Sequence, residues 1–276
     1  MKIPESLRPL LEQGLITEVV RPLMSGKEAS VYVVATASAY CVAKVYKDAE
    51  HRSFRQRAAY TEGRQVRNTR QRRAMEKGTK FGKELNEAAW HTAEVDHLAK
   101  LGAAGVRVPR VIAYSDGVLL MDIVLDAEGQ PAPRLCDCTF TPELAWATHG
   151  FVLRQVVRML CAGVVHGDLS EYNVLMAWDG PMVIDLPQAV DAANNRSARA
   201  ILLRDIDSIT AFLARFAPNL AETRYGPEIW QLFERAQLFP DTPLTGRWRP
   251  SERRVDARAV LREVEAVAKE ARFRRQ

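Results

Sequence analysis

The first half of the chain has the hydrophobic pattern of a β-sheet, and this limits the folds that it can adopt. Residues 31–46 are β-rich on both sides of a small-residue turn near Ser38, which predicts a β-hairpin. Residues 106–124 predict a second hairpin that turns at Asp116 and Gly117. We therefore expect antiparallel strands in the N-terminal part.

The pattern then becomes helical. Thr141 is a typical N-cap residue, and Pro142 favours the first helical position, so we expect a long amphipathic helix from there to about Cys161. A loop, a strand, a turn at 179–180 and a second strand ending at Asp185 should follow. The chain is expected to be helical with loops from about Arg196. Further helices are expected at residues 5–14, 85–105 and 256–272.

These elements indicate an α+β chain with a β-rich first lobe and an α-rich second lobe. We place the first lobe at residues 1–124, an extended linker at 125–140 and the second lobe at 141–276. A chain of 276 residues is long enough to bury a core in this arrangement. Ligands usually bind in clefts between such lobes.

The composition is that of an ordinary globular protein, with 47% hydrophobic and 26% charged residues. No apolar run approaches the roughly 20 residues that span a bilayer, and the N-terminus lacks a signal-peptide core. The four cysteines suit a reducing compartment, so we expect a cytoplasmic protein without a membrane partner. Cys136 and Cys138 have no second pair nearby, which favours incidental thiols over a zinc site.

Residues 51–83 form a basic segment with eleven Lys or Arg and two Glu, a net charge of +9. Such a segment is either a solvated insert or a surface for a phosphate-rich partner such as RNA or a ribosomal particle. It has few aromatic residues, so base stacking is not indicated. The sequence leaves both interpretations open.

Three polar residues of the second lobe have the spacing of a phosphoryl-transfer site. Asp168 and Asn173 lie five positions apart in HGDLSEYN (166–173), which matches the D-x-x-x-x-N catalytic loop of protein kinases. In that pattern the aspartate takes the proton of the acceptor hydroxyl and the asparagine binds a divalent metal. Asp185 follows twelve residues after Asn173, in a position to hold metal ions that bridge phosphates.

The first lobe supplies a lysine that fits the same chemistry. Lys44 lies within an apolar strand, where an unpaired ammonium is costly, so it should pair with a carboxylate or a ligand phosphate. Glu94, on the following helix, is the candidate partner, and a strand Lys paired with a helix Glu holds the phosphates in protein kinases. The Gly-centred turn in MSGKEASVY (24–32) can bring backbone N–H groups to phosphate oxygens.

At these residues the sequence resembles the RIO family of atypical serine/threonine protein kinases, over about residues 15–220. The most specific motifs are HGDLSEYN and the string IDLPQAV (184–190). The resemblance extends to several shorter segments, namely SGKEA (25–29), AKVYK (43–47), Trp90 with Glu94, and PAP (131–133). It looks like the first subgroup, in a compact bacterial-type version, and implies a bilobal protein-kinase-like fold with ATP in the cleft.

The resemblance also implies a role for each matching residue. It implies that Asp168 is the catalytic base and that Asn173 and Asp185 bind Mg2+ or Mn2+. Family members can carry a phosphorylated aspartate at the position of Asp185, so the resemblance makes Asp185 a second catalytic candidate. The expected nucleotide-binding residues are Ser25, Gly26, Lys27, Glu28, Ala29, Lys44, Glu94, Met121 and Ile123.

Three activities remain open at this point. The first is ATP-dependent phosphorylation of protein Ser or Thr hydroxyls, including autophosphorylation. The second is an ATPase-type assembly factor that acts on ribosomal particles or RNA. The third is a small-molecule kinase, against which Ser170 and Glu171 argue. No Ala-Pro-Glu follows Asp185, and Gly167 replaces the arginine that reads an activation-loop phosphate, so regulation through that loop is not expected.

Overall fold

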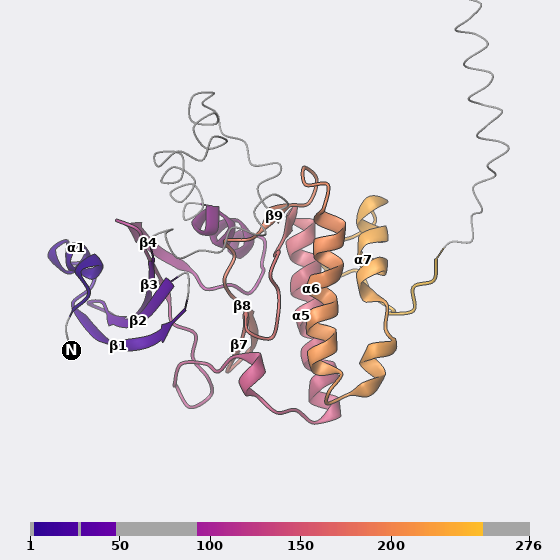
Figure 1. Ribbon diagram of the computed structural model, residues 1–276, viewed down its shortest axis with the longest axis horizontal. Helices are drawn as coiled ribbons and strands as arrows, with labels where there is room; N and C mark the ends of the chain where they lie inside the picture. Colours follow the sequence, from indigo (N-terminus) through magenta and orange to yellow (C-terminus); the bar gives the residue numbers. More distant parts are fainter. Residues whose placement is uncertain (1–2, 27–28, 48–92, 251–276) are drawn as a thin grey trace, which may run out of the picture.

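The computed structural model describes residues 3–26, 29–47 and 93–250. Lys27, Glu28, the basic segment at 51–83 and the helix expected at 256–272 therefore lie outside the described residues. Figure 1 shows the β-rich N-terminal part and the helical C-terminal part side by side, joined by extended chain. The expected α+β arrangement is confirmed.

The N-terminal part is a five-stranded antiparallel sheet in the order β1-β2-β3-β5-β4. Its strands are β1 (Glu18–Ser25), β2 (Ala29–Ala35), β3 (Tyr40–Tyr46), β4 (Val111–Ser115) and β5 (Val118–Asp122). Both expected hairpins form, and the second turns at Asp116 and Gly117 with positive φ values of 50° and 75°. These values suit the two-residue turn that matches the twist of paired strands.

The sequence did not predict β1, because Pro22 interrupts it. The strand lies at the edge of the sheet, where a residue without an N–H is tolerated. Its pairing with β2 shifts register between Val19 and Arg21 and between Pro22 and Met24. These irregularities break the alternating pattern by which a strand is recognised in a sequence.

The two faces of the sheet have different neighbours. One face packs on the short N-terminal helices η1 (Glu5–Leu7) and α1 (Arg8–Glu12), in a cluster that includes Cys41 and Ala43 of β3. Lys44 follows on β3 and pairs in register with Leu119, which belongs to the other, larger core cluster. Because side chains alternate along a strand, the Lys44 side chain lies on the opposite face of the sheet from those of Cys41 and Ala43.

The C-terminal part is built on three helices that lie side by side in Figure 1. They are α5 (Pro142–Cys161), α6 (Ala198–Leu213) and α7 (Tyr225–Glu234), with the 3-10 turns η4 (Leu135–Asp137) and η5 (Pro218–Glu222) beside them. The expected bounds of α5 are confirmed, and the Thr141 hydroxyl accepts a hydrogen bond from the Leu144 N–H at 3.2 Å. Within the described part of the chain, no helix is long and apolar enough to cross a membrane.

Two small pairs of strands lie between α5 and α6 in the sequence. The first pair is β6 (Val164–Val165) with β9 (Val190–Asp191), and the second is β7 (Val174–Ala177) with β8 (Gly180–Val183). The turn at 179–180 is as expected, but β8 ends at Val183 rather than at Asp185. Asp185 has a left-handed backbone with φ of 68°, which cannot continue a strand.

The three helices meet at a buried histidine. His149 on α5 hydrogen-bonds Thr210 on α6 at 2.8 Å, and its ring packs against that of Tyr225 on α7 at 5.5 Å between centroids. Since the Thr210 hydroxyl donates to the Ile206 carbonyl, His149 Nε2 is the donor to Thr210. Burial lowers the pKa of His149 from 6.5 to about 4.

This pKa predicts a loss of stability in acid. Between pH 6.5 and 4, His149 is protonated in the unfolded chain but neutral in the folded chain. The free energy of unfolding therefore falls as the pH falls, by up to about 3 kcal/mol. Urea unfolding of the wild type and of His149→Gln across this range measures the effect. Gln can still donate to Thr210 but does not titrate, so its pH dependence should be shallower. Identical slopes would contradict the prediction.

Candidate active site

The ammonium group of Lys44 joins the two parts of the protein. Its Nζ lies 2.7 Å and 3.0 Å from the two carboxylate oxygens of Glu94, and 2.7 Å from Oδ1 of Asp185. Glu94 belongs to the helix at residues 93–103, and Asp185 follows β8. The pairing of Lys44 with Glu94 is as the sequence indicated. The direct contact with Asp185 was not predicted.

Burial makes these charges depend on one another. Glu94 is 1% exposed and Lys44 is 8% exposed. Burial alone would lower the pKa of Lys44, but the carboxylates of Glu94 and Asp185 outweigh it and raise that pKa, so the ammonium stays charged. Burial would raise the pKa of Asp185, but Lys44 and the more distant cations together lower it. Lys44 and Asp185 are therefore held in their ionised forms.

Tyr46 completes this cluster, and the sequence did not indicate it. Its hydroxyl donates a hydrogen bond to Oε2 of Glu94, and the Lys44 ammonium lies 5.3 Å from the centre of its ring. Burial and the neighbouring Glu94 raise the pKa of Tyr46, so the hydroxyl remains a donor. Tyr46 is two residues after Lys44 on β3, and side chains two apart on a strand share a face.

Asp168 and Asn173 lie together in the loop between β6 and β7. The Asn173 Nδ2 donates to the backbone carbonyl of Asp168 at 2.8 Å and to its Oδ2 at 3.3 Å. These two bonds identify the amide nitrogen and leave Asn173 Oδ1 as the remaining oxygen ligand. Burial raises the pKa of Asp168, which makes its carboxylate a stronger base.

His166 ties this loop to the segment that carries Asp185. The backbone N–H of Asp168 donates to Nδ1 of His166 at 3.2 Å, so Nδ1 is an acceptor and Nε2 is the protonated nitrogen. Nε2 donates to the Ile184 carbonyl at 3.0 Å. The Ile184 N–H in turn donates to the Asn173 carbonyl at 3.0 Å. The expected base and both expected metal ligands are thus fixed relative to one another.

Two residues of helix α6 hydrogen-bond to the backbone of the same loop. Asp205 accepts a hydrogen bond from the Gly167 N–H at 2.8 Å, and Arg204 donates to the Gly167 carbonyl. Sequence reasoning missed both residues. The available signal was the position of Asp205, which lies at helical spacing between Ile201 and Ile209 on the apolar stripe of α6. In the structure Asp205 is 2% exposed.

The Gly-centred turn lies between β1 and β2. The Gly26 N–H donates to the Ala29 carbonyl at 2.9 Å, and Lys47 donates to the Ser25 hydroxyl at 3.0 Å and to the Gly26 carbonyl at 2.8 Å. Lys47, which was not among the expected site residues, therefore fixes one side of this turn. The side chains of Lys27 and Glu28 lie outside the described residues.

Met121 and Ile123 lie at the end of β5, where the chain leaves the sheet. Both are half-buried, and Met121 pairs in register with Val42. Among the described residues, no hydrogen bond or ion pair links either side chain to the Lys44 cluster. Their expected contact with a nucleotide stays a prediction.

A magnesium ion fits the oxygen atoms present. Asn173 Oδ1 and the Asp185 carboxylate are hard ligands of the kind that Mg2+ prefers. Within the described residues, no group of three or more His, Cys, Asp or Glu is arranged to hold a metal by itself. Mg2+ in nucleotide sites uses one or two protein ligands together with phosphates, so these two residues suffice.

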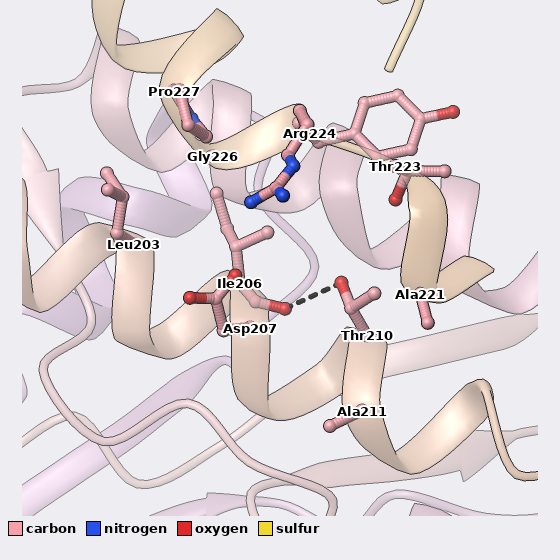
Figure 2. Close-up of a pocket in the computed structure, with 11 residues that line it drawn as sticks. Leu203, Ile206, Asp207, Thr210, Ala211, Ala221, Thr223, Arg224, Gly226 and Pro227 are labelled. Carbon is pink, nitrogen blue, oxygen red and sulfur yellow. Dashed lines mark hydrogen bonds between the residues drawn. The ribbon is translucent and has the colours of Figure 1, made fainter. Parts of the chain in front are cut away.

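A hollow on the second lobe lies away from these residues. The hollow has a volume of about 280 Å3 and is formed by α6, η5 and the start of α7. Figure 2 shows the residues that line it. Leu203, Ile206 and Pro227 line it, with the exposed side chains of Asp207 and Arg224 at its rim. No residue of the Lys44 cluster or of the catalytic loop contributes to it. The phosphoryl-transfer residues are thus grouped by their mutual contacts and not by this hollow.

Comparison with known proteins identifies relatives of the chain. The family model described as "RIO domain" matches residues 30–225. The RIO-type serine/threonine-protein kinase Rio1 of Haloferax volcanii is 33% identical over 209 residues, which cover 75% of this chain and 67% of the relative. The serine/threonine-protein kinase RIO1 of Homo sapiens is 30% identical over 219 residues, which cover 78% of this chain and 36% of the relative.

The structure of a kinase domain aligns with 72% of this chain and 63% of its own length, at a TM-score of 0.46 and 14% identity. The chain spans about two thirds of the length of the archaeal relative, but only 36% to 41% of the human and Schizosaccharomyces pombe relatives.

The buried ion pair makes a prediction about stability. Lys44→Met leaves the Glu94 carboxylate buried without its cation, which should cost roughly 3–5 kcal/mol. Adding Glu94→Leu to the same chain removes the stranded charge and should recover most of the loss. Urea denaturation of the single and double variants measures both effects. A double variant as unstable as Lys44→Met would show that the stranded charge is not the cause.

Proposed function

The chain belongs to the RIO domain family, and we propose that its site transfers the γ-phosphoryl group of ATP with Asp168 as base. The relatives are named serine/threonine-protein kinases, so the chain is an ATP-dependent kinase for Ser or Thr hydroxyls. We include autophosphorylation in this proposal. The observation that carries it is the contact of Lys44 with both Glu94 and Asp185, which brings together groups from both lobes.

Asp168 takes the proton in the proposed reaction. The acceptor hydroxyl oxygen forms a bond to the γ-phosphorus, the bond from that phosphorus to the bridging oxygen breaks, and ADP leaves. The hydroxyl proton passes to the Asp168 carboxylate. Its pKa, raised by burial, favours this transfer, and the Asn173 amide orients the carboxylate.

Asn173 and Asp185 are the proposed ligands of Mg2+, with Mn2+ as an alternative. The metal would neutralise charge on the phosphates when it is bound. Lys44, positioned by Glu94, would then contact the phosphates as well. The remaining proposed nucleotide contacts are Ser25, Gly26, Lys27, Glu28, Ala29, Met121 and Ile123.

The physiological context is proposed more broadly. We place one kinase domain across the chain, with the first lobe at residues 1–124, the linker at 125–140 and the second lobe at 141–276. The cytoplasm is the proposed location. A protein substrate, and a ribosomal particle or RNA bound through the basic segment, are the proposed partners.

The base assignment predicts the effect of removing one carboxylate. Asp168→Ala should lower turnover with ATP and Mg2+ by about 100-fold to 10,000-fold, because the proton loses its acceptor, while ATP binding persists. Transfer of label from γ-labelled ATP measures turnover, and equilibrium titration measures binding. Asp207→Ala removes an exposed carboxylate from the other side of α6 and should change neither. Nearly full turnover in Asp168→Ala would contradict the assignment.

The same assay separates the alternative activities. Label held as a Ser or Thr ester resists acid and is released by alkali, which supports the kinase. Label on Asp185 as an acyl phosphate is released by hydroxylamine, which would support the ATPase-type assembly factor. Transfer to an aminoglycoside or choline, without label on protein, would support a small-molecule kinase.

The proposed RNA contact predicts a change in salt dependence. Replacing Arg70, Arg72 and Arg73 with Gln should reduce the slope of log affinity against log salt concentration by about two to three, if each arginine neutralises one phosphate. Filter binding to ribosomal RNA at several salt concentrations measures the slope. The control replaces the exposed Arg199, Arg215 and Arg235 with Gln and has the same net charge. A slope that is equal in both variants would count against the basic segment.

A further inference from the structure

Arg134 is held at the boundary between the linker and the second lobe. It is the N-cap residue of η4, and its backbone forms an antiparallel bridge with Leu175 of β7. The preceding Pro133 accepts a hydrogen bond from the Met176 N–H at 2.8 Å through its carbonyl. Pro131 and Pro133 restrict the backbone that leads to it. The direction in which the Arg134 side chain leaves the chain is therefore fixed.

The guanidinium of Arg134 has only one hydrogen-bond acceptor among the described residues. Its Nη2 donates to Sδ of Met24 at 2.6 Å, and a thioether is a weak acceptor. Its Nε is buried and has no hydrogen-bond partner in the part of the chain that the structure describes. No carboxylate of the described residues forms an ion pair with it. A buried N–H donor such as this Nε normally has an acceptor.

The surroundings of Arg134 indicate what kind of anion it would bind. Met24 immediately precedes Ser25 and Gly26 of the Gly-centred turn, so one end of the guanidinium is at the base of that turn. On the other side is β7, where Leu175 pairs with Arg134 and lies two residues after Asn173 of the catalytic loop. Arg134 thus lies between the Gly-centred turn and the catalytic loop.

We infer that Arg134 binds the phosphate chain of ATP. The inference rests on the proposed function, since it takes ATP to lie between the Gly-centred turn and Asp185. An arginine has five N–H donors in a planar arrangement that matches two phosphate oxygens, and Nε is one of the two donors of such a bidentate contact. The phosphate oxygens would supply the acceptors that the described residues do not. Lys44, in contrast, already has two carboxylate partners.

The test compares ligands that differ only in phosphate. ATP, ADP and adenosine are titrated, with Mg2+, into the wild type, Arg134→Gln and Arg134→Lys, and affinities are measured by calorimetry. Arg134→Gln should weaken ATP by about tenfold or more, because a charge-assisted hydrogen bond is lost, and should leave adenosine unchanged. Arg134→Lys should recover part of the loss, since it restores the charge but not the bidentate geometry.

Two control variants separate phosphate binding from an effect on the fold. Met24→Leu keeps an apolar side chain against Arg134 but removes the sulfur acceptor, so it should retain ATP affinity. Arg215→Gln removes an exposed arginine that follows α6 and should also have no effect. If Met24→Leu weakens ATP as much as Arg134→Gln does, Arg134 acts through the Gly-centred turn and the inference is overturned.

The outcome distinguishes this inference from the proposed function. If the wild type binds ATP and Lys44→Met weakens that binding, but Arg134→Gln does not, only the role of Arg134 is refuted. If Arg134→Gln weakens ATP and adenosine equally, Arg134 does not read the phosphates and the inference also fails. If the wild type does not bind ATP, the proposed function fails, and the role of Arg134 fails with it.

Discussion

The buried ammonium of Lys44 is the interaction on which the site depends. A lone charge at 8% exposure would cost several kcal/mol, and here it is offset by two carboxylates from different parts of the chain. Glu94 comes from the helix at 93–103, and Asp185 comes from the segment after β8. The sheet, that helix and the second lobe must therefore meet at one point. Fold and site are fixed by the same three charges.

Support for the catalytic loop comes from within the second lobe. In protein kinases with a His-Arg-Asp loop, the arginine reads an activation-loop phosphate. Gly167 stands at that position here, and its backbone N–H and carbonyl are bound by Asp205 and Arg204 of α6. Because Asp205 is 2% exposed, this support belongs to the core. These contacts hold the backbone of the loop to α6 within the folded second lobe.

The features that depend on a few neighbouring residues could be predicted from the sequence. They are the turn at Asp116 and Gly117, the helix cap at Thr141 and the pairing of the buried Lys44 with a carboxylate, and each is found as expected. The edge strand β1 was missed because Pro22 interrupts its strand pattern. The register irregularities in its pairing with β2 could not be predicted from the sequence either. Asp205, Tyr46 and Arg134 were missed because their partners are distant in the chain: 38, 48 and 110 residues away.

Lys44 and Arg134 differ in the interactions that each would lose on binding a polyphosphate. Lys44 is held by two carboxylates, so a phosphate must compete with Asp185 for its ammonium. Arg134 has a thioether as its acceptor and is bound to no carboxylate of the described residues, so contact with a phosphate costs it little.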